Sequence, residues 1–374
     1  MGDFCIPPLP EHLQRLLETP CIVIDVEKTR ENIANMQRAA NDARCALRPH
    51  IKSHKMSCFA VLQVEAGASG ISCAKISEAE IMARDGLDDI FVAGPLAGAF
   101  RLRRAVKLAR QVRRLILATD SAEGAAALDQ AAEAAGLSLE VRMKLDARLG
   151  RTGVVFEKAL DLAKAIMDCR NLRLTGIYTF KSLPCPGKAA AAGREEGELM
   201  TEAARRLRDA GIPLQDISAE SAPAGLARTG LVTEIRPGTY IFNDYIRYKE
   251  GAAALGDIAA HFYVTVVSTP RRDYAVIDGG IKTFPMDVPL DMPPHYYPSY
   301  ALADGREDLR LTRLYEEHGI LSCPEGGDTG LQVGQILRLI PLHICPAVNL
   351  QNEVYLYERG VLYRGTVDAR GMAV

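Results

Sequence analysis

The sequence predicts an α/β protein in which a parallel (β/α)8 barrel is followed by a smaller domain made mostly of β-strands. Three observations lead to this prediction. Short apolar runs rich in β-branched residues alternate with helix-like runs, at a repeat of roughly 25 residues. The alternation continues for about eight units, which favours a closed barrel over an open sheet. Near Gly251 the long helical runs stop, whereas strand-like runs continue.

The expected barrel strands are short and apolar, and most of them precede a helix-like run. The first strand covers residues 21–26, and the helix over 27–43 places Ile33 and Met36 on one face. The later strands are expected at 44–51, 70–74, 89–93, 114–119, 137–145, 172–180 and 216–219. The later helices are expected at 58–67, 78–84, 100–112, 121–135, 156–168 and 195–210. This order is typical of βαβ units and a parallel sheet.

The second domain is expected to contain strands without long helices between them. We place the barrel at residues 19–250 and the β domain at 251–374, with residues 1–18 packing on the β domain. Gly, Pro and Asp are dense at 279–298 and 324–329, as is typical of long loops. The expected strands of this domain are 261–270, 274–278, 335–340 and 354–357.

The composition excludes several classes of function. With 374 residues, 48% hydrophobic and 25% charged, the chain can bury a large core. Its 45 basic and 47 acidic residues give a net charge of −2, so no basic field is present to bind nucleic acid or an anionic membrane. No apolar run is long enough to span a membrane, and the N-terminus lacks a signal-peptide pattern. The nine cysteines are scattered, which favours a reducing compartment, so we expect a cytoplasmic protein.

Residues 48–55 combine an arginine, two histidines and two lysines at the end of a predicted strand. If the strand reaches this point, alternation places His50, Lys52 and His54 on one side of it, at the mouth of the barrel. Desolvation favours the neutral amine of a lysine, which is the form that attacks a carbonyl carbon. Judged on this segment alone, a reactive lysine and a cluster of surface lysines are equally good interpretations.

Several short motifs occur along the chain in a characteristic order. They are Thr19-Pro20, Arg48-Pro49-His50-x-Lys52-x-His54-Lys55, Lys75-Ile76-Ser77-Glu78-Ala79-Glu80, Gly150-Arg151-Thr152-Gly153-Val154, Arg236-Pro237-Gly238-Thr239-Tyr240, Glu316-Glu317-His318-Gly319 and His343-x-Cys345-Pro346 with Asn349-Leu350. Over residues 19–94 and 233–350 the chain resembles the D-threonine aldolase and D-serine dehydratase family. These are pyridoxal-phosphate enzymes with an alanine-racemase-like barrel and a β domain, so the resemblance implies that fold and that cofactor.

The resemblance implies that Lys52 carries pyridoxal 5′-phosphate as a Schiff base, with His50 in the same cofactor site. Arg151 matches a family arginine near the phenolic oxygen of the cofactor, where a cation stabilises the phenolate. Tyr240 is expected near the pyridine nitrogen, where a neutral hydroxyl would leave that nitrogen largely unprotonated. Tyr178 is expected to stack on the cofactor or to hydrogen-bond to it. Packing in the core is the alternative interpretation for both tyrosines.

The predicted phosphate site departs from the family pattern. The family holds the phosphate with a turn of small residues, often Gly-Ser-Thr, and the matching residues here are Glu220, Ser221 and Ala222. Because a carboxylate repels a phosphate dianion, we expect Glu220 to point away. Ser221 and Ala222, together with backbone N–H groups, are then expected to bind the phosphate. The turn at Gly238 and Thr239 is expected to form the second phosphate contact.

His343 and Cys345 are candidate metal ligands. At positions i and i+2 of a strand, two side chains point to one face. Imidazole and thiolate together suit Zn²⁺, with Mn²⁺ as the alternative divalent ion. For an isolated pair, a buried histidine beside an inert cysteine is the simpler interpretation. The resemblance reverses this preference because the position matches a divalent-metal site near the cofactor. Several family members carry aspartate in place of Cys345, and the thiolate here favours zinc.

Catalytic candidates besides Lys52 are His54 and His318. His318 is a candidate base or substrate contact, with a structural histidine as the alternative. After Tyr178 many family members carry Gly-His, whereas residues 180–185 here begin with Phe180 after Thr179, so the substrate side chain is left open.

The resemblance implies a lyase that acts on a small D-β-hydroxy-α-amino acid and forms a homodimer. We expect retro-aldol cleavage to glycine and an aldehyde, as in D-threonine aldolase. The alternative is dehydration of a substrate such as D-serine or D-threo-3-hydroxyaspartate to a keto acid and ammonia. An amino-acid racemase, which needs no metal, is a further alternative, and a non-catalytic cofactor carrier is the least favoured.

Overall fold

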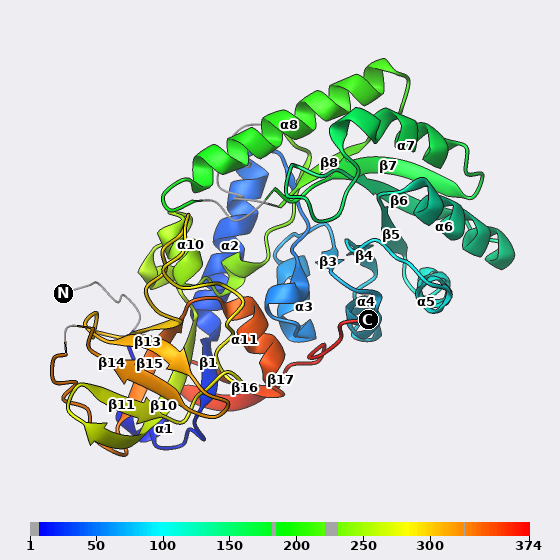
Figure 1. Ribbon diagram of the computed structural model, residues 1–374. Helices are drawn as coiled ribbons and strands as arrows, with labels where there is room; N and C mark the ends of the chain where they lie inside the picture. The colour runs from blue at the N-terminus through cyan, green and yellow to red at the C-terminus, as the bar shows by residue number, and fades with distance from the viewer. Residues whose placement is uncertain (1–6, 182–184, 221–230, 325) are drawn as a thin grey trace.

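The computed structural model describes residues 7–181, 185–220, 231–324 and 326–374. It contains a parallel barrel surrounded by helices and a separate, largely antiparallel sheet (Figure 1). The predicted fold class, an alanine-racemase-like (β/α)8 barrel with an added β domain, is confirmed. In the described residues no helix is long and apolar enough to cross a membrane.

Eight parallel strands form the barrel, in the order β2-β9-β8-β7-β6-β5-β4-β3. A parallel bridge between His50 and Ser72 connects the two ends of this order and closes the ring. The strands are β2 (Ala46–Leu47), β3 (Ile71–Cys73), β4 (Asp89–Val92), β5 (Arg114–Thr119), β6 (Leu139–Lys144), β7 (Leu172–Tyr178), β8 (Asp216–Ala219) and β9 (Glu234–Ile235).

Amphipathic helices cover the outside of the barrel, as the arc of α5 to α8 shows in Figure 1. Their ends follow ordinary capping chemistry: the Ser121 side chain accepts a hydrogen bond from Gly124 N, and Gly136 ends the same helix with a φ of 63°. The barrel helices are α2 (Val26–Asp42), α3 (Ser57–Glu65), α4 (Ile76–Arg84), α5 (Ala99–Ala109), α6 (Ala122–Ala135), α7 (Ala159–Met167) and α8 (Ala189–Asp209), with 3-10 turns η1 (Ile51–Ser53), η2 (Phe156–Lys158) and η3 (Thr239–Ile241).

The second sheet has nine strands and its own hydrophobic core. Two short helices lie beside the cavity described below: α10 (Tyr245–Lys249) and α11 (Ile344–Leu350). Near the N-terminus, α1 (Glu11–Gln14) places Leu13 against Tyr263. The strands are β1 (Cys21–Asp25), β10 (Ala260–Arg271), β11 (Tyr274–Ile277), β12 (Ala301–Ala303), β13 (Arg310–Leu314), β14 (Gly319–Ser322), β15 (Ile336–Pro341), β16 (Glu353–Glu358) and β17 (Val361–Thr366), and the 3-10 turn η4 (Leu255–Asp257) precedes β10.

Two sequence-based assignments in the barrel are wrong. The predicted first strand, β1, lies in the second sheet, where Ile22 pairs with Phe262 of β10 and Val23 with Tyr355 of β16. Both faces of β1 are buried, so its apolar sequence has the same pattern as that of a barrel strand. The remaining barrel strand is β9, which has only two residues and gives no periodic signal.

The strand expected at 44–51 is also shorter than predicted. Only Ala46–Leu47 pairs as β2, and the chain then passes through Pro49 into the 3-10 turn η1. Lys52 therefore lies on a tight turn, and the expected alternation of His50, Lys52 and His54 along a strand does not occur.

Buried ion pairs inside the barrel hold the short strands β2 and β9 in place. Arg48 donates from Nε to Glu234 Oε2 at 2.8 Å and from Nη1 to Asp89 Oδ1 at 2.5 Å. Arg142 donates from Nη1 to Glu234 Oε1 at 2.5 Å. Burial would raise the pKa of Glu234, but the cations Arg142 and Arg48 hold this pKa well below its usual range. The network ties β9 to β4, β6 and the segment that follows β2.

Candidate functional site

A cavity of about 560 Å³ opens at the carboxyl ends of the barrel strands. Its walls come from the segments that follow β2, β3, β6, β7, β8 and β9, and from α10 and α11 on the opposite side. In barrels of this type the carboxyl ends of the strands are where catalytic side chains gather. The volume lies in the range of pockets that hold cofactors and small ligands.

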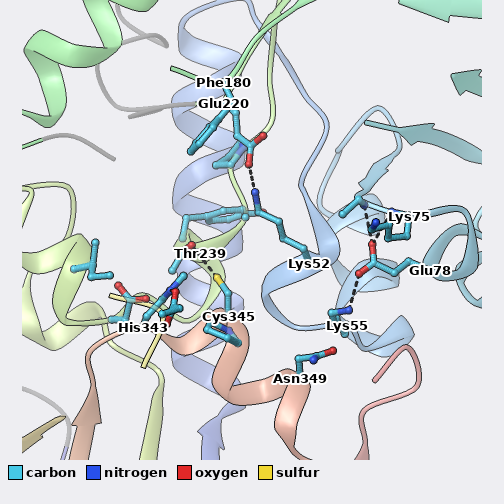
Figure 2. Close-up of a pocket in the computed structure, with 18 of the residues that line it drawn as sticks. Lys52, Lys55, Lys75, Glu78, Phe180, Glu220, Thr239, His343, Cys345 and Asn349 are labelled. Carbon is cyan, nitrogen blue, oxygen red and sulfur yellow. Dashed lines mark hydrogen bonds and ion pairs between the residues drawn. The ribbon is translucent and has the colours of Figure 1, made fainter. Parts of the chain in front are cut away.

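Lys52 reaches into this cavity from η1 and contacts a carboxylate. Its Nζ lies 2.5 Å from Glu220 Oε1 and 5.4 Å from the centroid of the Phe180 ring (Figure 2). The Lys52 side chain is 37% exposed and that of Glu220 is 11% exposed. The expectation that Glu220 points away from the site is therefore wrong. The carboxylate turns inward because the opposite charge of Lys52 compensates for its burial.

The charge state of Glu220 follows from its neighbours. Burial alone would raise the pKa of the Glu220 carboxyl, but Lys52, His50 and Arg236 lower it to about 2. The carboxyl group is thus ionised at neutral pH.

The cavity brings together much of the predicted site. The predicted residues that line it are Lys52, Arg151, Gly238, Thr239, Tyr240, His343 and Cys345. Ser221 and Ala222 lie outside the described residues. The remaining four predicted residues, His50, Tyr178, His54 and His318, do not line the cavity, and their positions are given below.

His343 and Cys345 lie side by side at the start of α11, where His343 is the N-cap residue and Cys345 is in the first turn. The expectation of a strand here is wrong, although the two side chains still meet. His343 Nδ1 lies 2.6 Å from Asp287 Oδ2, and Cys345 Sγ lies 3.1 Å from Ser53 Oγ. The buried Asp244 carboxylate accepts a hydrogen bond from Ile344 N at 3.1 Å and so anchors the start of the helix.

His343 and Cys345 stabilise each other's charged forms, and a metal bound by the pair would displace the extra imidazole proton. Burial would lower the pKa of His343, but Cys345 and Asp287 raise it well above its ordinary value. Burial would raise the pKa of the Cys345 thiol, but His343 lowers it. An adjacent imidazole and thiolate form a donor set that fits zinc, and the Asp287 contact orients the imidazole. Within the described ranges, no three His, Cys, Asp or Glu side chains converge in a geometry that could hold a metal.

The cavity also has features that suit a pyridoxal-phosphate cofactor. A β-carbon at Gly238 would lie 2.8 Å from Ser53 Oγ and 3.1 Å from the His50 carbonyl oxygen, so only glycine lets this turn approach the turn of Lys52. The buried Nε of Arg236 has no hydrogen-bond partner among the described residues. A primary amine, a close glycine turn and a buried guanidinium with one N–H left to donate together suit an anionic aldehyde.

Comparison with known proteins agrees with this site. The family described as "Alanine racemase, N-terminal domain" matches residues 24–245, and "Putative serine dehydratase domain" matches residues 259–357. The chain is 28% identical to a D-threonine aldolase from Arthrobacter sp., over 96% of this chain and 94% of that protein. It is 32% identical to D-threo-3-hydroxyaspartate dehydratase from Delftia sp. strain HT23, over 88% of this chain and 91% of that protein.

A solved structure supports the same relationship. A cysteine-to-alanine variant of D-threo-3-hydroxyaspartate dehydratase, in its metal-free form, superimposes with a TM-score of 0.86 at 29% identity. The match covers 94% of this chain and 98% of that one. The chain belongs to the D-threonine aldolase and D-serine dehydratase family. It is therefore a lyase of the pyridoxal-phosphate-dependent class, as the sequence predicted. The family includes both aldolases and dehydratases, so membership alone does not select one reaction.

In this family member, two of the predicted residues pack beside the cavity. His50 is buried below the Lys52 turn, and its Nδ1 accepts a hydrogen bond from Lys52 N at 3.4 Å. Burial, followed by the charge of Lys52, lowers the pKa of His50 well below its ordinary value. Tyr178 is also buried, and its hydroxyl donates to the Ala93 carbonyl at 2.6 Å. For Tyr178 the placement agrees with the alternative interpretation of core packing.

The two other predicted catalytic histidines lie away from the cavity. His54 is fully buried, its Nδ1 accepts from Met56 N at 3.1 Å, and its ring packs edge-on against Phe59 and Phe242. Burial lowers the pKa of His54 to about 4. His318 is exposed in the turn between β13 and β14. These positions are at odds with direct catalytic roles for the two histidines within this chain.

Several cavity residues were not assigned roles from the sequence. Lys55 Nζ lies 2.7 Å from Glu78 Oε1, and Glu78 also accepts from the backbone N of Ala74 at 2.7 Å and of Lys75 at 3.2 Å. Lys55, Lys75, Glu78 and Asn349 belong to the family motifs, so their motif positions were a usable signal. Asp287 lies in a proline-rich loop that carries no such signal.

Proposed function

We propose that this enzyme dehydrates a D-β-hydroxy-α-amino acid to a keto acid and ammonia, using pyridoxal phosphate on Lys52 and a divalent metal, most simply Zn²⁺, at His343 and Cys345. The observation that carries the proposal is the composition of the cavity. It contains an exposed lysine amine and an imidazole–thiolate pair, but His343 is the only one of the chain's seven histidines, all within the described residues, that lines it.

The residues that would hold the cofactor surround Lys52. Arg151 and Tyr240 would contact the ring, and the Gly238–Thr239 turn, with the predicted Ser221 and Ala222, would bind the phosphate. When bound, pyridoxal phosphate supplies an aldehyde for an amine and a conjugated ring that accepts the electron pair released at the substrate α-carbon.

The remaining steps are assigned to the chain's own groups. Lys52 Nζ would remove the α-proton of the substrate, since it is a primary amine that lines the cavity. A metal at His343 and Cys345 would act as a Lewis acid for the departing β-hydroxide. Asp287 would keep Nδ1 of His343 occupied, so that Nε2 is left for the metal.

Retro-aldol cleavage needs a group that removes the proton of the β-hydroxyl. The predicted bases His54 and His318 lie elsewhere, and Phe180 lines the cavity at the position where many family members carry histidine. Phe180 packs within 5.2 Å of the Arg151 guanidinium, measured to the ring centroid, and offers no base. This favours elimination, in which Lys52 itself is the base, over the aldol cleavage that the sequence first suggested.

Aldol cleavage remains the second candidate, since a metal held by His343 and Cys345 would supply a Lewis acid that makes the substrate β-hydroxyl more acidic. Identity to the Arthrobacter D-threonine aldolase supports it almost equally. A racemase is the third candidate, and the fit of His343 and Cys345 to a metal counts against it.

One product assay separates the three reactions. Zinc-loaded and chelator-treated enzyme is incubated with D-serine, D-threonine and D-threo-3-hydroxyaspartate. We expect a keto acid plus ammonia from the zinc-loaded enzyme and little turnover after chelation. Glycine plus an aldehyde would replace the dehydratase proposal with the aldolase. Inversion of the amino acid without loss of carbon or nitrogen, unaffected by chelation, would identify a racemase. Sedimentation of the same preparation would test the expected homodimer.

A further inference from the structure

Glu220 is the residue at which this chain departs most clearly from the pattern it resembles, because a carboxylate stands at the position of a small phosphate-site residue. The carboxylate faces the cavity, and its Oε1 lies 2.5 Å from Lys52 Nζ. At this distance the amine and the carboxylate form a charge-assisted hydrogen bond. The protein thus has its reactive lysine already engaged by an internal anion.

The surroundings of the pair are strongly cationic. Arg236 Nη2 lies 3.8 Å from Glu220 Oε2, and Lys144 also interacts with the Glu220 charge. Lys144 donates from Nζ to Thr152 Oγ1 at 2.5 Å; burial, together with Arg151, lowers its pKa to about 8.

We propose that Glu220 is a positioning residue that holds the Lys52 side chain in an ion pair, and so controls how fast the cofactor is loaded. The proposal rests on the proposed function, in which Lys52 forms the covalent bond to the cofactor. It adds a residue-specific device that slows the formation of this bond.

The chemistry of loading explains the effect. The lysine nitrogen must first lose its extra proton to solvent, since only the lone pair of the neutral amine can attack the aldehyde carbon. A carbon–nitrogen double bond then forms, and the aldehyde oxygen leaves as water. An ammonium ion held by Glu220 resists the first step. The carboxylate also repels the incoming phosphate dianion.

Arg236 offers the carboxylate an alternative partner during loading. Its Nη2 is already 3.8 Å from Glu220, and its buried Nε is without a hydrogen-bond partner among the described residues. A rotation of the Glu220 side chain toward Arg236 would release Lys52 while keeping the carboxylate paired. The device is therefore reversible and needs no movement of the barrel.

The test compares Glu220→Gln with the unmodified enzyme. Cofactor-free protein is mixed with pyridoxal 5′-phosphate at neutral pH, and the covalent bond is followed by its visible absorbance and by borohydride trapping with peptide mapping. Glu220→Gln should load about tenfold faster, because the amide keeps the shape of the side chain but removes its charge. Glu220→Asp should remain close to the unmodified rate. Glu195→Gln, which removes the carboxylate of an exposed pair with Lys181, should load like the unmodified enzyme.

A second measurement does not depend on the cofactor. Cofactor-free protein is treated with trinitrobenzenesulfonate, and labelling of Lys52 is followed by peptide mapping, with circular dichroism as the check on folding. Lys52 should react about tenfold faster in Glu220→Gln than in the unmodified protein. Equal labelling rates would overturn the proposal. If labelling accelerates but neither protein bonds the cofactor, the pairing of Glu220 with Lys52 stands, whereas the proposed function fails and with it the control of loading.

Discussion

Lys52 and Lys55 lie three residues apart, and each faces a glutamate in the wall of the same cavity (Figure 2). The Lys52 side chain is 37% exposed and that of Lys55 is 10% exposed. Glu220 contacts Lys52 through one oxygen, whereas Glu78, which is 1% exposed, also accepts two backbone N–H groups at the start of α4. A lysine and a glutamate thus form an exchangeable contact at Lys52 and Glu220, and a buried structural contact at Lys55 and Glu78.

The two pairs differ in what else the glutamate holds. A lysine whose glutamate also binds backbone N–H groups is fixed in the structure, whereas a lysine whose glutamate has an alternative side-chain partner is free to react. Glu78 caps α4 while it pairs with Lys55, so neither partner can leave without exposing unsatisfied donors. Glu220 follows β8, and Arg236 Nη2 lies 3.8 Å from its second carboxylate oxygen, so Arg236 is an alternative partner for this carboxylate. A lysine whose partner can be exchanged is available for covalent chemistry.

The largest expected effect on activity comes from replacing Lys52, the lysine proposed to bind the cofactor. Lys52→Ala should abolish the covalent bond to the cofactor and lower turnover by at least about a thousandfold, because nucleophile and α-proton base are lost together. Absorbance of the bound cofactor and keto-acid release measure the two effects. Lys55→Met should keep the covalent bond on Lys52, as peptide mapping after borohydride reduction would establish. A label that moves to Lys55 in Lys52→Ala would contradict the division of roles.

The sequence predicted the fold class well because buried strands and helices have characteristic apolar patterns. These patterns are visible in short stretches of the sequence. It did not place β1, since a strand buried on both faces has the same pattern in either sheet. It also missed β9, whose two residues are held by the ion pairs of Glu234 with Arg48 and Arg142. Such pairing depends on residues distant in the chain, so no local pattern reveals it.

The residues of the candidate site were predicted from motifs. The predictions that differ from the structure concern the directions in which side chains point. His54 belongs to the Lys52 motif, yet the turn η1 directs its ring into the core rather than into the cavity. Glu220 was expected to avoid the site because a phosphate would repel it. The structure gives it Lys52 as a partner across 168 positions of sequence. Motifs identify which residues gather at a site, whereas side-chain direction depends on turn geometry and on partners far away in the chain.

The buried pair of Lys55 and Glu78 should contribute to the stability of the fold. Glu78→Gln leaves Lys55 largely buried without its counter-ion, and losing one partner of a buried pair costs about 3–5 kcal/mol. The free energy of unfolding in urea measures this change. Glu220→Gln should lower that free energy by less than about 1 kcal/mol, since Lys52 is exposed to the cavity. Equal losses in the two variants would mean that both pairs are structural.

The smallest effect concerns His54, which lies between the two lysines. Its pKa is lowered by burial to about 4 in the folded protein, against about 6.5 in an unfolded chain. The unfolded state therefore takes up a proton first as the pH falls. The stability contributed by the neutral, buried ring is present above pH 6.5 and is lost as the pH falls toward 4.

Replacing His54 should remove this pH dependence. Between pH 7 and pH 5 the free energy of unfolding of the unmodified protein should fall by about 2 kcal/mol more than that of His54→Gln. His50 and His261, also buried with lowered pKa values, keep a residual slope in both proteins. His12→Gln, at an exposed position of α1, should leave the slope unchanged. An unaltered slope in His54→Gln would mean that the pKa of His54 is the same in the folded and unfolded states, and that burial does not keep its ring neutral.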